Sequence, residues 1–419
     1  MSHGNLERRS VLLLHPTGNA FVRQAALALH QAGMLAAFHT TIAWRPGSVL
    51  DRFVPGRVRT ELARRSYSGI PAELIHTHPW NEMMRLIAQR REWHRLIRHE
   101  TGRFSMDAVC AALDRAVAHA LTRGPVTSAV YGYDDCAEET FTAAKRLGIR
   151  CVYELPIGHY RVYQQIVEEE HTLRPEWACT LTGIRDSPEK LARKDREIAH
   201  AESILVASSF TAKTLSTYPG RLTSHISLVP YGAPPVGPAR QLTRRGDALR
   251  VLFVGSIGQR KGISYLFEAV DQLQVPYTLT LLGRPVARPA VMEKALGRHR
   301  WIESAPHGEV LRLMREHDVL VFPSLFEGFG LVIFEAMAQG TVVITTPHTA
   351  APDILDDGHD GFIVPIRSAE AIAQRLTQLA EDRDLLYSMG EAGRRKAAEY
   401  GWDRYRTQWI NAIDASLAG

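Results

Sequence analysis

Two glutamates and two glycines stand close together after an apolar run in the C-terminal half of the sequence. Glu327 and Glu335 are separated by a segment that contains Gly328 and Gly330, where a helix is expected to begin. Glycines at such a point let a ligand approach the backbone N–H groups at the positive end of the helix dipole, which favours a diphosphate. A carboxylate only accepts hydrogen bonds, so each glutamate suits ligand hydroxyls. From the residue types alone, a glycine turn with two solvated glutamates is an equal alternative.

A second glycine-bearing loop follows the first apolar run of the C-terminal half and carries two adjacent cations. Negative charge develops on a departing nucleoside diphosphate, and fixed cations beside it stabilise the transition state. The chain has only seven lysines, which favours a role for the one in this loop over a merely solvated basic pair. The candidate residues of the loop are Gly255, Ser256, Gly258, Arg260 and Lys261.

The segment from Glu327 to Gly340 resembles the signature of glycosyltransferase family 4, a family of retaining enzymes with the GT-B fold. The likeness continues in order and spacing over residues 251–364, and it includes residues 197–210, 229–232 and the tail around Trp402. The resemblance implies that a sugar passes with retention from a nucleoside diphosphate sugar to a glycan, a lipid or a small metabolite. It implies that Glu327 contacts hydroxyls of the donor sugar and that Glu335 holds the nucleotide ribose. The backbone expected near the diphosphate or the sugar is that of Phe329, Gly330, Leu331 and Val332.

Other positions match the family less closely. The family often has an arginine where this chain has Ser256, so either Arg260 takes that role or the grip on phosphate is weaker. The resemblance places Arg284 near the nucleotide and Trp301 beside its base, although a surface arginine and a core tryptophan explain both residues too. Asp353 stands where the family usually has a glutamate that borders the donor sugar.

Candidates in the N-terminal half follow two expected strands. The family carries a histidine near the reacting sugar, and His159 is the choice here, with Glu154 as its competitor and an ordinary loop histidine as the alternative. Gly18 and Asn19 lie on the first βα loop, which in such folds faces the interdomain cleft. They are expected to contact the acceptor, and a plain turn explains them as well.

Apolar runs alternate with amphipathic stretches along the whole chain, which predicts an α/β protein with parallel sheets. With the resemblance, the predicted fold is GT-B: two Rossmann-like doubly wound parallel-sheet domains facing a central cleft, with a C-terminal helix that crosses back. The acceptor-binding domain is expected at 1–236, with 400–419 packed on it, and the donor-binding domain at 248–399. Three prolines mark the linker at 234–247. Strands are predicted at 11–14, 129–131, 151–154, 204–207, 250–254, 277–282, 319–322, 342–345 and 361–364, and residues 50–123 read as helical.

Charge is concentrated early in a chain whose net charge is +5. Residues 45–103 carry twelve arginines and six acidic residues. Such a face is either solvated or in peripheral contact with an anionic membrane, and no nucleic-acid motif accompanies it. The N-terminal apolar run is too short for a signal peptide, which predicts a cytoplasmic protein, at most peripheral at the inner membrane face. The four scattered cysteines read as reduced thiols.

No metal and no cofactor are expected, because Lys261, Arg260 and a helix N-terminus would neutralise the diphosphate. Two alternatives stay open. One is another GT-B enzyme, a phosphorylase or a sugar-nucleotide epimerase, and the other is a non-catalytic nucleotide-sugar-binding protein. A glycogen-type phosphorylase would need a lysine for pyridoxal phosphate, and lysines are scarce in the C-terminal half.

Overall fold

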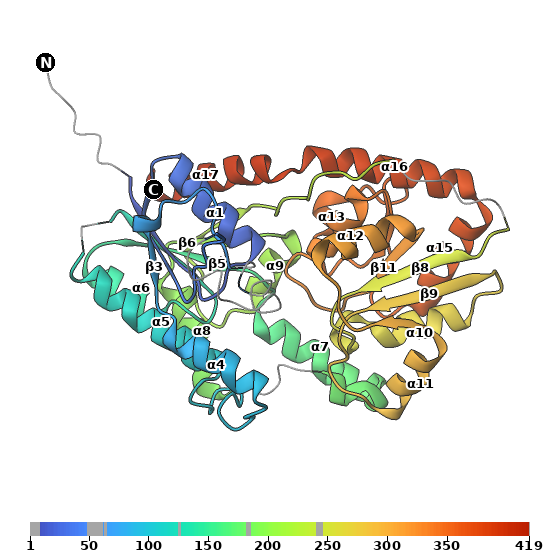
Figure 1. Ribbon diagram of the computed structural model, residues 1–419, viewed down its shortest axis with the longest axis horizontal. Coiled ribbons are helices and arrows are strands. Elements are labelled where there is room, and N and C mark those ends of the chain that lie inside the picture. Colours follow the sequence, from blue (N-terminus) through green and yellow to red (C-terminus); the bar gives the residue numbers. More distant parts are fainter. Residues whose placement is uncertain are drawn as a thin grey trace, which may run out of the picture.

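A computed structural model describes residues 9–47, 62, 65–124, 127–181, 186–239 and 246–418. The described chain forms two parallel sheets, one in each half, flanked by helices (Figure 1). The N-terminal sheet has seven strands, β1 (Val11–Leu14), β2 (Leu35–Thr40), β3 (Ile75–Thr77), β4 (Ala129–Tyr133), β5 (Arg150–Leu155), β6 (Ser203–Val206) and β7 (His225–Leu228). The C-terminal sheet has six, β8 (Leu249–Val254), β9 (Tyr277–Leu282), β10 (Arg300–Ile302), β11 (Val319–Phe322), β12 (Val342–Thr345) and β13 (Phe362–Ile363).

The strand order reverses once in each sheet, and the two reversals mark the ligand edges. The N-terminal order is β3-β2-β1-β4-β5-β6-β7, and the C-terminal order is β10-β9-β8-β11-β12-β13. In doubly wound sheets, ligands bind outside the carboxyl ends of the strands at the point of reversal. The loops after β1 and β4, and those after β8 and β11, therefore border the expected sites. The two-domain doubly wound prediction is confirmed.

The helices fill the connections between the strands. In the N-terminal half they are α1 (Ala20–Gln31), α4 (Trp80–Arg90), α5 (Met106–Leu121), α6 (Glu138–Arg146), α7 (Tyr160–Leu173), α8 (Pro188–His200) and α9 (Ser209–Thr214). In the C-terminal half they are α10 (Ile263–Asp271), α11 (Ala290–Arg298), α12 (His307–Glu316), α13 (Leu331–Ala338), α14 (Ala351–Ile354), α15 (Ala369–Glu381) and α16 (Arg383–Glu399). Among the described residues, no helix is both long and apolar enough to pass through a bilayer.

The region 50–123 is not the continuous helical stretch that its Arg-rich pattern predicts. It contains the short edge strand β3, the helices α4 and α5, and irregular turns from 91 to 105. Much of its first part lies outside the described residues, including Arg52, Arg57, Arg59 and Arg64. Residues 240–245 of the predicted linker lie outside them too.

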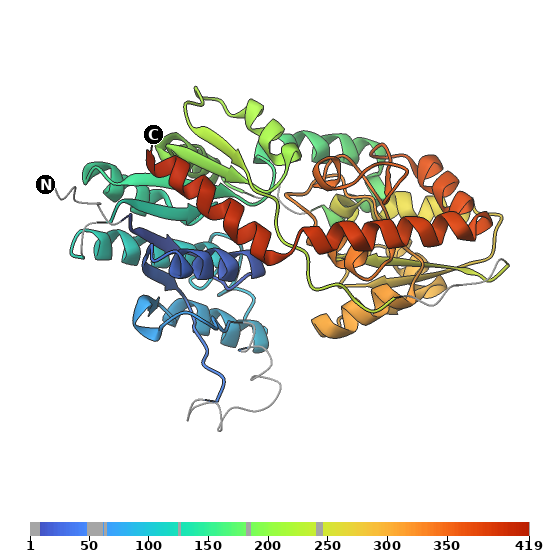
Figure 2. The same ribbon diagram turned by 90° about the horizontal axis from the view of Figure 1, so that it is seen from above.

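The last helix, α17 (Trp402–Ala418), leaves the C-terminal half and crosses to the N-terminal half, as predicted. Figure 2 shows α16 over the C-terminal half and α17 continuing diagonally over the N-terminal one. Trp409 is buried there, and its indole N–H donates to the Tyr131 hydroxyl at 3.1 Å. Tyr405 is also buried, so both side chains anchor the crossing helix.

Candidate active site

Glu327, Lys261 and Arg260 meet at the reversal point of the C-terminal sheet. Glu327 lies on the loop after β11, and the two cations lie on the loop after β8. The Lys261 ammonium donates to Glu327 Oε1, and Arg260 Nη1 donates to the same oxygen at 2.7 Å. Arg260 Nη1 also donates to the Phe326 carbonyl at 2.8 Å. The structure thus brings three predicted residues into one ion triad.

Glu327 and Lys261 are buried and Arg260 is half-buried, and burial shapes the protonation of the triad. Burial alone raises the pKa of Glu327, but Lys261 and Arg260 outweigh that effect and hold the pKa below its usual value. Burial lowers the pKa of Lys261, and Glu327 offsets part of that effect. The Lys261 ammonium also lies 4.6 Å from the centre of the Phe322 ring. The site therefore keeps an ionised carboxylate between two cations that an incoming anion can recruit.

A buried carboxylate on α7 supports the cationic loop, and the sequence did not predict it. Glu170 on α7 is fully buried. It accepts hydrogen bonds from Gln259 Nε2 at 2.6 Å and from Arg367 Nε at 2.6 Å, and the Tyr265 hydroxyl donates to it at 3.1 Å. Gln259 directly precedes Arg260, so Glu170 positions the cationic loop. Its partners lie far away in sequence, and the run of glutamates at 168–170 gives no signal for which one is buried.

The loop of Glu327 is pressed against the N-terminal half. A Cβ on Gly328 would lie 1.7 Å from the Pro156 carbonyl oxygen, so only glycine fits there. The Gly328 carbonyl accepts hydrogen bonds from the hydroxyls of Ser208 and Thr211 on the other side of the cleft. The space that Gly328 vacates is therefore filled by the facing half, whereas the sequence predicted a ligand there.

Glu335 faces a cavity between the two halves. The cavity has a volume of about 370 Å³, and its lining includes Ala20 and Leu331, the first residues of α1 and α13. Arg23, His307 and Trp402 line it as well. Burial raises the pKa of Glu335, and His307, 3.7 Å away, lowers it in part. Two helix N-termini, one from each half, thus open on one cavity that also holds charged side chains.

The other residues that the sequence predicted as ligand contacts near the first turns of α1 and α13 have different surroundings. Gly330 has a positive φ of 85° and directly precedes α13, and Val332 is half-buried in its first turn. Phe329 is buried and its ring packs on Tyr231 at 5.1 Å. Asn19 precedes α1 without a side-chain cap, and the Gly18 carbonyl accepts from Arg23 Nη1 at 2.8 Å. Only the region of α1 and α13 fits the predicted anion site.

His159 is turned away from the ion triad. Its ring is buried in the N-terminal half, with Nδ1 3.1 Å from the Thr217 hydroxyl and Nε2 3.5 Å from Asp195. Burial lowers the pKa of His159, and Asp195 opposes the change. Its competitor Glu154 is buried too, and accepts from the hydroxyls of Tyr131 and Tyr231. Glu154 is satisfied within the N-terminal core, whereas His159 Nε2 is buried without a hydrogen-bond partner among the described residues. Both side chains make their contacts in the N-terminal half, so in this arrangement neither joins the C-terminal site.

The remaining candidates of the C-terminal half lie at the rim or serve packing. Arg284 is 71% exposed and pairs with Glu303 on the surface, so it is not with the triad. Ser256 is exposed, half-buried Gly255 has a positive φ of 145° that favours glycine, and Gly258 packs under Val286 and the Thr180 carbonyl. The Trp301 indole N–H donates to the Gly283 carbonyl at 2.9 Å. Asp353 accepts from the Ser209 backbone N–H at 2.7 Å, so in this structure it ties the two halves together.

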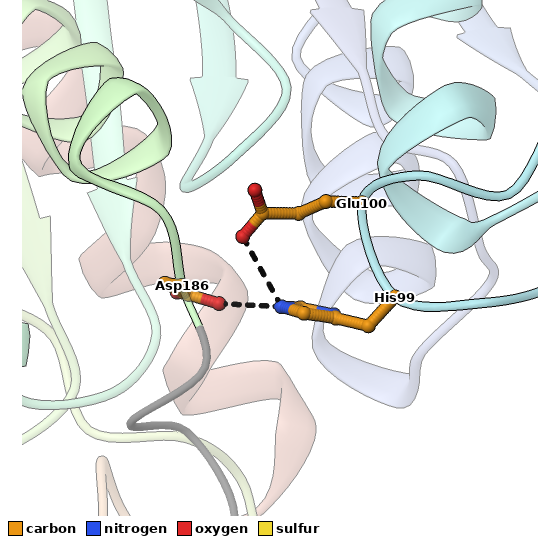
Figure 3. Close-up of side chains that lie close together, drawn as sticks. All are labelled: His99, Glu100 and Asp186. Atoms are coloured by element: carbon orange, nitrogen blue, oxygen red, sulfur yellow. Dashed lines mark hydrogen bonds and ion pairs between the residues drawn. The ribbon is translucent and has the colours of Figure 1, made fainter.

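One cluster in the described part of the chain has metal-ligand residue types, and it lies outside the cleft. His99 points toward Glu100 and Asp186, with Nε2 at 3.3 Å and 2.8 Å from their oxygens (Figure 3). The Lys190 ammonium lies 3.1 Å from Asp186, so a cation of the protein already occupies this group. The sequence also contains a D-x-D pattern, Asp382-Arg383-Asp384, at the start of α16, where Asp382 caps the helix by accepting from the Leu385 backbone N–H at 2.9 Å.

Comparisons with known proteins agree with this geometry. Residues 239–396 match the family model described as Glycosyl transferases group 1. The chain is 29% identical over 263 residues to a D-inositol 3-phosphate glycosyltransferase of Streptomyces bingchenggensis, a match that covers 56% of this chain and 58% of that protein. It is 28% identical over 193 residues to the putative colanic acid biosynthesis glycosyltransferase WcaL of Salmonella typhimurium, covering 42% and 47%. The chain thus spans about half the length of the curated relatives it matches.

Solved structures extend the likeness to the whole fold. Sucrose-phosphate synthase of Thermosynechococcus elongatus superposes with a TM-score of 0.66 at 18% identity, covering 98% of this chain and 100% of that one. Anabaena HepE in complex with UDP and glucose superposes with a TM-score of 0.62 at 14% identity, covering 97% and 100%. At such identities the likeness concerns the fold. Residues 239–396, which form most of the second doubly wound domain, thus match a glycosyltransferase group 1 domain, and the two sheets together share the GT-B fold of these solved structures.

Proposed function

We propose that this protein transfers a sugar, with retention, from a nucleoside diphosphate sugar to an acceptor bound mainly by the N-terminal half. The observation that carries the proposal is the cavity of about 370 Å³ between the first turns of α1 and α13, with Glu335 in its wall. Helix N-termini attract anions, and a carboxylate can accept two neighbouring hydroxyls. The cavity therefore suits a diphosphate that carries a ribose.

The ion triad supplies the second half of the proposal. When the bond between the anomeric carbon and the diphosphate breaks, negative charge grows on the leaving oxygen. Lys261 and Arg260 lie one loop away; Lys261 is buried and Arg260 is half-buried, so their charge acts more strongly than it would in open water. As they turn to the diphosphate, Glu327 is released to accept hydrogen bonds from the donor sugar. The acceptor oxygen bonds to the anomeric carbon on the face that the diphosphate leaves, and its proton passes to the departing phosphate oxygen.

The relatives favour particular donors as first tests. Anabaena HepE was solved with UDP, with UDP-glucose, and with UDP and glucose. We infer that a uridine diphosphate sugar is the donor, bound with its ribose at Glu335. The acceptor is left open among glycans, lipids and small metabolites, and the proposed chemistry uses cations of the chain in place of a metal.

A thermal-shift screen tests the donor site directly. UDP, GDP, ADP and their common sugar conjugates are added to the wild type, to Glu335→Ala and to the control Glu381→Ala, which changes an exposed glutamate of α15. We expect uridine ligands to stabilise the wild type and the control. Glu335→Ala should bind them more than about tenfold weaker, the worth of a hydrogen bond to a charged group.

The same screen contains the outcomes that contradict the proposal. Stabilisation of Glu335→Ala equal to that of the control would remove Glu335 from the donor site. A protein that binds a nucleotide sugar but neither hydrolyses nor transfers it would be the non-catalytic alternative. Phosphate-dependent release of a sugar phosphate, or conversion of the donor to its epimer, would identify another GT-B enzyme.

A further inference from the structure

Helix α4 presents its apolar side chains to solvent. Trp80, Met83 and Ile87 follow one another at helical spacing along one stripe, and they are 66%, 48% and 42% exposed. The opposite side of the helix buries Glu82, which pairs with Arg65 Nη2 at 2.6 Å and with Arg85 Nε at 2.6 Å. A helix on a globular protein normally turns its apolar stripe inward. In α4 the buried side holds Glu82 and Ala88, and the stripe of Trp80, Met83 and Ile87 lies on the exposed side, uncovered by the described part of the chain.

Unpaired cations border this stripe. Arg90 ends α4 and Arg91 follows it, and Arg95 and Arg98 lie on the turns that come next. All four are exposed, and within the described part of the chain none of them has an ion pair. Trp93 stands among them and is 47% exposed. The surface from 80 to 98 therefore combines apolar and aromatic side chains with an excess of positive charge, four exposed arginines against the one exposed acid Glu92.

We propose that residues 80–98 dock on an anionic lipid bilayer, with α4 lying in the plane of the interface. Trp80, Met83 and Ile87 would enter the boundary between headgroups and acyl chains, and the arginines would bind the lipid phosphates. Charge complementarity selects this occupant. A second copy of the chain, docked through the same surface, would bring the arginines against like charges. No nucleic-acid-binding motif accompanies the arginines, and an apolar stripe along one helix face suits the boundary between headgroups and acyl chains.

The position of α4 connects this surface with the cleft. The helix begins directly after β3, at the carboxyl edge of the N-terminal sheet, where the loop after β1 also lies. Figure 1 shows α4 at the lower border of the N-terminal half, on the same side as α7. Docking through α4 would hold the rim of the cleft beside the bilayer and leave the two halves free to move.

Flotation with vesicles tests the proposal. The wild type should float with vesicles of phosphatidylglycerol and phosphatidylcholine, but not with phosphatidylcholine alone, and high salt should release it. Met83→Glu combined with Ile87→Glu should weaken binding at least tenfold. Arg90→Ala combined with Arg91→Ala should weaken it about 25-fold, since each basic side chain near an anionic surface contributes about fivefold.

The matched control is Leu228→Glu. Leu228 is 45% exposed on β7, the edge strand opposite β3, and it should float like the wild type. Thermal shifts with nucleotides should be unchanged in all these variants, which separates this inference from the proposed function. The proposal is overturned if the wild type does not float with anionic vesicles, or if Leu228→Glu loses as much binding as the α4 variants. A self-association in solution that Met83→Glu and Ile87→Glu abolish would overturn it in favour of a second copy.

Discussion

Glu170→Gln perturbs the support of the cationic loop without touching the loop itself. In the wild type, Oε1 accepts from Arg367 Nε at 2.6 Å and Oε2 accepts from Gln259 Nε2 at 2.6 Å. A glutamine offers one acceptor oxygen, so one of these two donors must face an NH₂ group. A buried donor without its partner costs about 1–3 kcal/mol. Arg367 keeps its ion pair with Glu169. The hydrogen bond that Gln259 loses is therefore the change that affects the cationic loop.

The expected result has a stability part and a binding part. We expect the free energy of unfolding to fall by about 2 kcal/mol, which lowers the Tm of a domain of 150–250 residues by about 4–8 °C. Nucleotide affinity, measured by calorimetry, should also fall, because Arg260 and Lys261 follow Gln259 on the displaced loop. Glu168→Gln is the control, since Glu168 is exposed on the same helix. A Glu170→Gln variant with wild-type Tm and affinity, or a control that falls as far, would show that Glu170 does not support the cationic loop.

Two further predictions concern charge. Lys261→Ala should lower turnover by about 10² or more, as for the loss of a group that stabilises the transition state, and the exposed Lys294→Ala should leave it unchanged; near-normal turnover would refute the role of Lys261. Burial raises the pKa of Glu154 from 4.5 to about 6, despite hydrogen bonds from Tyr131 and Tyr231 that lower it. The folded state therefore binds this proton more tightly, and about 2 kcal/mol of stability, present below pH 4.5, should be lost as the pH rises through 6. Glu154→Gln should abolish that part of the pH dependence in denaturant titrations at pH 4–7, whereas a constant difference from the wild type would contradict the assignment.

Those parts of the fold that depend on local pattern were predictable from the sequence. Buried parallel strands read as short apolar runs, and Val11–Leu14 and Val319–Phe322 are fully buried. The edge strands β3, β7 and β10 were not predicted, because most of their residues are half-buried or exposed, and β3 sits in an Arg-rich stretch with a helical pattern. The inner strand β2 was not predicted either, and its run is interrupted by half-buried alanines and a histidine. Edge strands bury too little apolar surface to produce a run.

The residues of the candidate site also fall into those that a local pattern predicted and those that it did not. Glu327, Arg260 and Lys261 lie on loops whose glycines and flanking strands are visible in the sequence, and the structure brings them together. His159 has a similar setting, yet its ring turns inward to Asp195, which follows it by a whole helix and loop. Glu170 gains its role only from partners on distant segments. Long-range packing decides such residues, and no local pattern records it.

The crossing of α17 has a consequence for synthesis of the chain. Trp409 and Tyr405 complete the core under β4, but they are made about 170 residues after β7. At a translation rate of roughly 5–20 residues per second, that interval is roughly 10–35 s. During this time the nascent N-terminal half has its strands but lacks the helix that covers Tyr131 and Phe21. A chaperone that binds exposed aromatic surface would find its target in this window, and the C-terminal half would fold before the N-terminal half is finished.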